Sequence, residues 1–269
     1  MTATRTLIFA SALILAPFLP AQQNSTGPST YGSSVSYHVP DETRVAFETW
    51  LKDKYRKYAE AMLKEEPSIQ SMSVTRVIYG GVKEPEANFY STTFQQGVPK
   101  PRTALQNKVT QQLFGKSYRD FLQEAFPLRK RLGQTLSRRV TGTTGGNAAE
   151  GDVIRLDYKK IAPGRTGDYF QLEQDYLRLR EAQVKAGKMS SWSASAVVLP
   201  QGTERGYDGF TVHVGKDLEQ VLSWGQGQAE IAAQLSPPLN LAGMALRTND
   251  IAKTVRVETR VYVMRVSRQ

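Results

Sequence analysis

Charged and polar side chains alternate with apolar ones in several short segments of this chain. Successive side chains of a β-strand point to opposite faces, so this pattern predicts strands with one polar and one apolar face. The polar faces supply the candidates for ligand binding: His38, Arg155, Asp157, Ser193, His213, Arg256, Glu258 and Arg260. Arg155 could pair with Asp157, since buried charges need partners. Glu258 could pair with Arg256 or Arg260. The apolar faces should lie against helices.

The N-terminal half carries the same pattern with hydroxyl groups in place of most charges. Its polar strand positions are Ser71, Ser73, Thr75, Ser91, Thr93 and His38. If the polar faces of both halves enclose a cavity, that cavity would hold an acidic or hydroxylated ligand. Two other interpretations are a network of side chains that satisfy one another between two sheets, and a face exposed to solvent.

His213 is the sharpest candidate for a specific chemical role. Positive charge on nearby Arg155 and Arg256 would lower its pKa and keep the imidazole neutral. A neutral ring could act as a general base or ligate haem iron. The alternative is an ordinary hydrogen-bonded histidine in a strand. The corresponding position in the N-terminal half is Thr93, so the two halves differ here.

Several kinds of catalytic centre are excluded by composition and motif. The chain has 2 histidines and no cysteine. It therefore has no disulfide, no catalytic thiolate and no histidine-rich metal centre. No zinc-protease, serine-hydrolase or P-loop pattern occurs. We expect no metal and no cofactor. Glu173 and Asp175 lie two apart on a predicted helix and point in different directions, so a solvated face is expected for them.

The chain is basic, and its first residues resemble an export signal. Lys and Arg number 35 against 25 Asp and Glu, a net charge of +10. Such a balance suits nucleic acid, anionic lipid or an acidic ligand, but no basic motif interleaved with aromatics supports nucleic acid. An apolar run from Leu7 to Leu19 follows Arg5 and precedes small residues, which predicts a signal peptide over residues 1–21. We expect a secreted or periplasmic protein without a membrane span.

A unit of sequence recurs about 120 residues apart, most clearly between Ser71–Val74 and Ser191–Ala194. Each copy predicts the order β-α-β-β-α-β. Helices are expected to begin at Asp41 and Thr166 as capping residues. The predicted organisation is a lead-in over residues 22–34, a first unit over 35–140, a linker over 141–152 and a second unit over 153–269. Two such units give an α+β fold of paired ferredoxin-like halves.

A family resemblance rests mainly on the second unit. The residues that carry it are Pro163-Gly164, Tyr169, Leu172-Glu173, Tyr176, Trp192 and Tyr207-Asp208. They resemble dimeric α/β-barrel domains, nearest to the NIPSNAP-type and stress-responsive branches. The resemblance implies that the two antiparallel sheets pack face to face into a barrel. A single chain would then be a pseudo-dimer and function as a monomer.

The resemblance does not assign one activity, because its superfamily includes monooxygenases, isomerases, haem enzymes and binding proteins. The favoured hypothesis is non-catalytic binding of a small polar or anionic molecule in the lumen. One alternative is an enzyme of the monooxygenase or haem-handling kind. Another is a cell-envelope scaffold whose lumen is filled by side chains.

Overall fold

The computed structural model describes residues 29–80, 87–144, 148–201 and 206–268. The first unit comprises β1 (Thr30–His38), α1 (Asp41–Trp50), a π-helical segment η1 (Leu51–Tyr55), α2 (Arg56–Glu65), β2 (Ile69–Tyr79), β3 (Phe89–Gln96), α3 (Thr103–Phe114), α4 (Tyr118–Gln123), the 3-10 helix η2 (Phe126–Leu128) and β4 (Lys130–Gly142). The second unit comprises β5 (Val153–Ile161), α5 (Thr166–Lys185), β6 (Ser191–Leu199), β7 (Gly209–Gly215), α6 (Leu218–Ser223), α7 (Gln228–Gln234), α8 (Leu241–Ile251) and β8 (Ala252–Ser267).

The strands form one closed antiparallel barrel in the order β1-β3-β2-β8-β5-β7-β6-β4. Each unit contributes four adjacent strands, ordered β4-β1-β3-β2 in the first and β8-β5-β7-β6 in the second. The two half-sheets join where β2 pairs with β8 and β4 pairs with β6. The predicted α+β class and the pseudo-dimeric α/β barrel are confirmed. The recurring sequence segments lie on topologically equivalent strands, β2 with β6 and β3 with β7.

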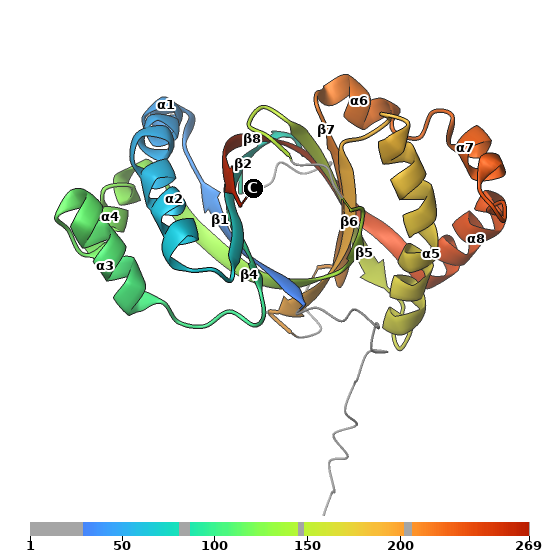
Figure 1. Cartoon of the computed structure of the whole chain (residues 1–269), viewed down its shortest axis with the longest axis horizontal. Coiled ribbons are helices and arrows are strands. Elements are labelled where there is room, and N and C mark those ends of the chain that lie inside the picture. Colours follow the sequence, from blue (N-terminus) through green and yellow to red (C-terminus); the bar gives the residue numbers. More distant parts are fainter. Residues whose placement is uncertain (1–28, 81–86, 145–147, 202–205, 269) are drawn as a thin grey trace, which may run out of the picture.

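Helices cover the outside of the barrel on two opposite sides, α1–α4 over the first half-sheet and α5–α8 over the second (Figure 1). In the first unit the sequence shows why the helices pack against the half-sheet. Apolar residues recur every three or four positions through α1, η1 and α2, which places them on one helical face. These residues are buried in the largest apolar cluster: Phe47, Leu51, Tyr55, Tyr58 and Met62.

Several boundaries differ from the sequence predictions. Strand β1 begins at Thr30, so residues 30–34 of the predicted lead-in pair with β3 and β4 on both sides. Ladder hydrogen bonds in a closed barrel order this Ser- and Gly-rich segment, which has few apolar groups of its own. Strand β4 likewise runs to Gly142, inside the predicted linker. The predicted signal peptide lies outside the described residues.

Both expected helix caps are also shifted by one residue. Pro40 occupies the N-cap of α1 and Arg165 that of α5, and neither makes a side-chain cap hydrogen bond. Asp41 instead lies in the first turn of α1 and pairs with Arg44 three residues later. Within the described residues no helix combines the length and the apolar character needed to cross a bilayer.

Candidate functional site

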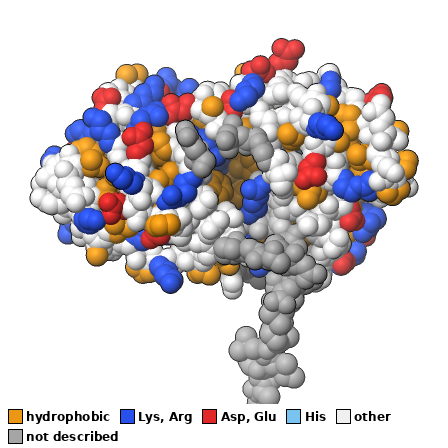
Figure 2. Space-filling model, in the orientation of Figure 1, with side chains coloured by type: hydrophobic (Ala, Val, Ile, Leu, Met, Phe, Trp, Pro, Cys, Tyr) orange, Lys and Arg blue, Asp and Glu red, His pale blue; other side chains and the backbone are white. Residues whose placement is uncertain are grey.

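A cavity of about 440 Å³ lies between the two half-sheets, inside the barrel. Figure 2 shows a hollow between the two halves of the molecule, with hydrophobic side chains visible inside it. This volume falls within the range of roughly 300–1,000 Å³ typical of small-molecule sites. The described side chains therefore do not fill the lumen.

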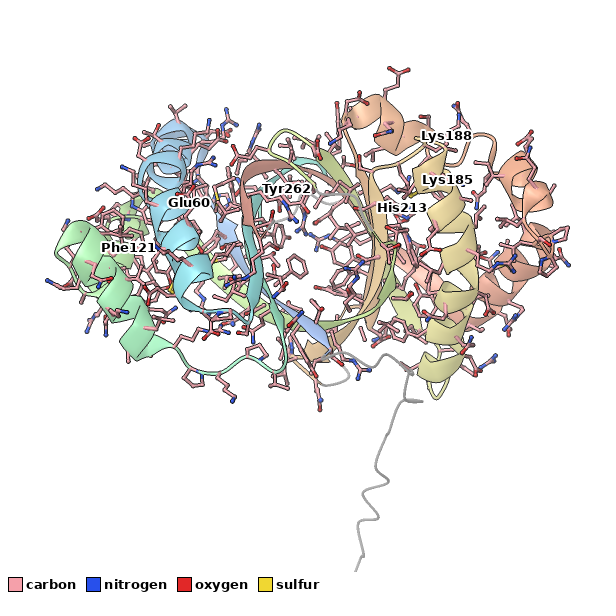
Figure 3. All side chains as sticks on the ribbon, viewed as in Figure 1. Glu60, Phe121, Lys185, Lys188, His213 and Tyr262 are labelled. Atoms are coloured by element: carbon pink, nitrogen blue, oxygen red, sulfur yellow. The ribbon has the colours of Figure 1, made fainter. Side chains whose placement is uncertain are left out.

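The two walls of the cavity have different chemistry. The first unit contributes mainly hydroxyl groups: Ser34, Ser36, Ser73, Thr75, Thr92, Thr135 and Ser137. The second unit contributes mainly apolar and aromatic groups: Ile154, Leu156, Tyr158, Tyr207, Phe210 and Val212. Tyr90, Phe94 and Tyr262 also line the cavity. Tyr262 can be located on the inner side of the barrel in Figure 3. A ligand in the lumen would thus meet a hydrogen-bonding wall and an apolar wall.

Two arginines from β8, Arg256 and Arg260, reach this cavity and share one carboxylate. Arg260 Nε donates to Glu258 Oε2 at 2.9 Å, and the Arg260 Nη2 group contacts the same oxygen. Arg256 contacts Glu258 Oε1. Tyr158 Oη donates to Glu258 Oε2 at 3.1 Å and accepts from Arg260 Nη2. Arg256 Nη2 also donates to Tyr90 Oη at 3.0 Å.

The members of this network differ in exposure. The side chain of Glu258 is 0% exposed and that of Arg260 is 5%, whereas Arg256 retains 35%. Burial raises the pKa of the Tyr158 phenol, and the positive charge of Arg260 only partly offsets this. Tyr158 is therefore a neutral hydrogen-bond donor. Arg256 is the charged group of the network that a molecule in the cavity could reach most easily.

The guanidinium groups also lie against aromatic rings. The Arg260 guanidinium carbon lies 3.3 Å from the ring centroid of Tyr90, and that of Arg256 lies 5.1 Å from the ring of Tyr158. Cation–π contacts of this kind hold the charge in place without neutralising it. The positive charge is thus oriented before any ligand enters.

The predicted site residues do not all lie on this wall. Arg256, Glu258 and Arg260 are together in the lumen network, as the alternation predicted. Ser193 pairs with Val212 and therefore shares the lumen face of β6, although it is not one of the cavity-lining residues. His38 is exposed at the end of β1 and is not among the cavity-lining residues.

Arg155, Asp157 and His213 lie on the opposite face, against the helices, so their expected orientation is corrected. Their strand neighbours line the lumen, and His213 pairs with Trp192, which packs under α5. The His213 ring centroid is 4.4 Å from that of Trp224. In Figure 3 His213 lies between the barrel wall and α5. Ser91 and Thr93 are reversed too, since Thr92 between them lines the cavity and the Ser91 hydroxyl meets Tyr55 of η1 at 3.2 Å.

The orientation of these residues towards the helices is explained by the side chains of α5. Helix α5 directs Glu173 and Arg180 towards the sheet, where both are buried. Glu173 is therefore not on the solvated face predicted for it. We call Asp157, Glu173, Arg180 and His213 the α5 cluster. Polar sheet residues meet polar helix residues there, which leaves the apolar sheet face to line the lumen.

Electrostatics within the α5 cluster keep His213 neutral. Burial lowers the pKa of His213 well below its ordinary value, and the positive charges of Arg180 and Arg155 lower it further. Its Nε2 atom lies 3.7 Å from Asp157 Oδ2, and its Nδ1 atom has no hydrogen-bond partner among the described residues. Burial raises the pKa of Glu173 and lowers that of Arg180. His213 is not among the cavity-lining residues, so its possible roles as a general base or a haem ligand in the lumen do not fit this position.

Sequence reasoning missed the aromatic members of the site. Tyr158 and Phe210 alternate with Asp157 and His213 respectively, so they belong to the apolar strand faces expected against the helices, and the polar pattern does not include Tyr90. One signal could have found Tyr158, since it stands across from Arg256 in the β5–β8 pairing. Among the described residues there is also no group of three or more His, Asp or Glu side chains that could hold a metal ion.

Comparisons with known proteins identify the fold. No family model matches the chain, and no curated protein does. A candidate monooxygenase from Lactobacillus acidophilus is 9% identical, with a TM-score of 0.56 over 89% of this chain and 96% of that one. A second candidate monooxygenase, from Fusobacterium nucleatum, is 9% identical with a TM-score of 0.56 over 90% and 96%. This chain shares the ferredoxin-like dimeric α/β-barrel fold with them, as the resemblance predicted.

Proposed function

We propose that this protein binds a small organic anion in the lumen of its barrel and does not transform it. One observation carries the proposal: two guanidinium groups at the cavity wall share the single carboxylate of Glu258. The cavity therefore keeps an excess of positive charge. Arginine offers several N–H donors in a fixed plane that matches a carboxylate, and Arg256 is accessible enough to use them.

The ligand should have an apolar, partly aromatic body. Tyr158 and Tyr207 meet with ring centroids 4.5 Å apart, and Phe210 lies 6.0 Å from Tyr158 on the same wall. Apolar surface buried against these rings would contribute most of the affinity, and the arginines would fix the orientation. The hydroxyl wall of the first unit could accommodate polar substituents.

A non-catalytic role is favoured by the chemistry of the lining. Its described residues include hydroxyl groups but no imidazole that could activate them as nucleophiles. Tyr158 is held in its protonated form, and Glu258 is occupied by two arginines. Neither group is free to act as a general base at neutral pH.

The proposal is tested by calorimetric titration of the purified protein with 2-naphthoate and with its uncharged analogue naphthalene-2-carboxamide. We expect the carboxylate to bind at least about tenfold more tightly than the amide. Arg256→Gln should remove most of that advantage. Arg119→Gln is the matched control, because it deletes the same charge from an exposed position on α4. Equal binding of the two compounds by the unaltered protein would overturn the proposal.

A monooxygenase remains the alternative hypothesis, since two structures with this fold carry that candidate name. It predicts oxygen consumption when an aromatic compound is added, which simple binding does not. The scaffold hypothesis required a filled lumen and is not favoured, because the described residues leave a cavity.

We also propose that the two units arose by tandem duplication of a domain akin to the NIPSNAP type, that one chain functions as a monomer, and that the protein is exported. Equivalent strand positions of the recurring segments support the first idea, and the N-terminal sequence supports the last. Mass spectrometry of the secreted protein would test cleavage near residue 21. Each unit expressed alone should aggregate, because the barrel strands β2, β4, β6 and β8 would lose partners.

A further inference from the structure

We infer that Glu258 sets the number of negative charges that the lumen accepts, and that the ligand is a monoanion. This inference rests on the proposed function and deepens it by naming the charge class of the ligand. Glu258 has no solvent exposure and lies between two arginines. It is therefore positioned to cancel one of their two charges, and a single positive charge is left for the ligand.

The charge balance follows from the residues that face the cavity. Arg256 and Arg260 are the charged side chains among its described lining residues, and Glu258 is the carboxylate that contacts both. Two cations and one anion leave a net charge of +1. A monocarboxylate restores neutrality. A dicarboxylate would carry one further charge without a cationic partner against the apolar wall of the cavity, where an unpaired ion is costly.

The two arginines have different roles in this arrangement. Arg260 is nearly inaccessible, and its donors are directed to Glu258 Oε2 and Tyr158 Oη. Arg256 is partly accessible and holds its place through Tyr90. We therefore assign Arg256 as the group that contacts the ligand. Arg260 and Glu258 together form a neutral pair that positions Tyr158 and, through Glu258, Arg256.

The experiment compares two anions that share one aromatic body, 2-naphthoate and naphthalene-2,3-dicarboxylate. Dissociation constants are measured calorimetrically at pH 7.5 and fixed ionic strength. We expect the unaltered protein to prefer the monocarboxylate by about tenfold or more, because the second carboxylate finds no cation to pair with. Glu258→Gln keeps the side-chain shape and removes the charge, so the preference should invert in favour of the dicarboxylate.

A double variant separates charge from shape. Glu258→Gln combined with Arg260→Met leaves Arg256 as the single cation, so preference for the monocarboxylate should return. Replacement of a buried ion pair by neutral groups of similar size is generally tolerated. Glu60→Gln on α2, an exposed position in the first unit, is the matched control and should leave the preference unchanged. Circular dichroism and thermal unfolding verify that each variant is folded.

The possible outcomes distinguish failure of the inference about Glu258 from failure of the proposed anion binding. If neither anion binds more tightly than naphthalene-2-carboxamide, the proposed function fails. If both anions bind through Arg256 but their ratio is the same in the unaltered protein and in Glu258→Gln, anion binding stands and the role of Glu258 is wrong. If Glu258→Gln does not fold, a preference of the unaltered protein for the dicarboxylate would still overturn the inference.

Discussion

The two units place helices over the same side of the same four-stranded topology, yet they build opposite interfaces. Under α1 and α2 the interface is aromatic, and Phe47 meets Phe89 edge-on with ring centroids 5.3 Å apart. Under α5 the interface contains the α5 cluster, with Arg180 lying 4.7 Å from the ring centroid of Trp224. Topology therefore does not decide which face of a half-sheet is polar. The side chains that a helix presents decide it.

This exchange of faces has a consequence for the lumen. The first unit directs most of its large apolar residues outward and most hydroxyl groups of β1, β2 and β4 inward. The sequence pattern suggested this for β2, whereas Ser91 and Thr93 of β3 face the helices instead. On β5 and β7 the second unit directs apolar residues inward, because the polar residues of these two strands meet α5; the charged residues of β8 stay inside the barrel. The barrel thus acquires one hydrogen-bonding wall and one apolar wall from two similar units. Such a cavity suits an amphipathic ligand better than two identical walls would.

The largest expected effect comes from removing one ring of the first unit's aromatic core. Phe47→Ala should lower the free energy of unfolding by about 3–5 kcal/mol, because it removes a fully buried ring from a close-packed cluster. Urea denaturation measures this. Val45→Ala is the control on the same helix, at 74% exposure, and should change stability by less than about 0.5 kcal/mol. Equal effects of the two substitutions would refute the assignment of the core face.

Trp192→Ala should lower the free energy of unfolding somewhat less than Phe47→Ala, by about 3 kcal/mol, although Trp192 is larger and also buried. Its surroundings include Arg180 and other polar groups, so water could enter the space and reduce the cavity term. Ser193→Ala, which alters the lumen face of the same strand, should change the free energy of unfolding little. A reversed order in denaturant melts would place Trp192 in the lumen and contradict the register.

The buried histidine should make stability sensitive to acid. The folded state lowers the pKa of His213 below the ordinary value of 6.5, so the unfolded chain binds more protons. Stability should then fall as pH drops below about 6.5, by up to about 1.4 kcal/mol per pH unit. His213→Gln should lack this component when unfolding is measured from pH 7.5 to 5. His38→Gln alters the exposed histidine and should retain it.

Glu173 should produce the opposite pH dependence. Its pKa is raised above 4.5 by burial, so the folded state binds more protons than the unfolded chain. Its stabilising contribution is complete below about pH 4.5 and is lost as pH rises through the folded-state pKa. The positive charge of Arg180 partly offsets this upward shift. Unfolding curves for Glu173→Gln at several pH values should lack this decline. A decline identical to that of the unaltered protein would show that Glu173 is ionised and solvated.

Much of the element order could be predicted from local pattern. The stripe from Phe47 to Met62 has helical spacing, and the alternation in Val153–Tyr158 has strand spacing, so both elements formed where expected. Boundaries failed where order depends on long-range pairing. Residues 30–34 form a strand because they pair with β3 and β4, and the side chains of this segment do not by themselves indicate a strand.

The candidate site likewise has a part that the sequence predicts and a part that depends on tertiary packing. Alternation alone determined that Arg256, Glu258 and Arg260 share one face of β8, and that Arg155 and Asp157 share one face of β5. The pairing of Arg155 with His213 adds the β7 histidine to that face. A period of two groups residues by face but does not say which face is inside. That choice depended on what packs against each side, and only the tertiary structure brought Glu173 and Arg180 of α5 onto the polar face of β5 and β7. Burying charge against charge costs less than burying it against apolar groups, so Tyr158 and Phe210 came to line the lumen while His213 did not.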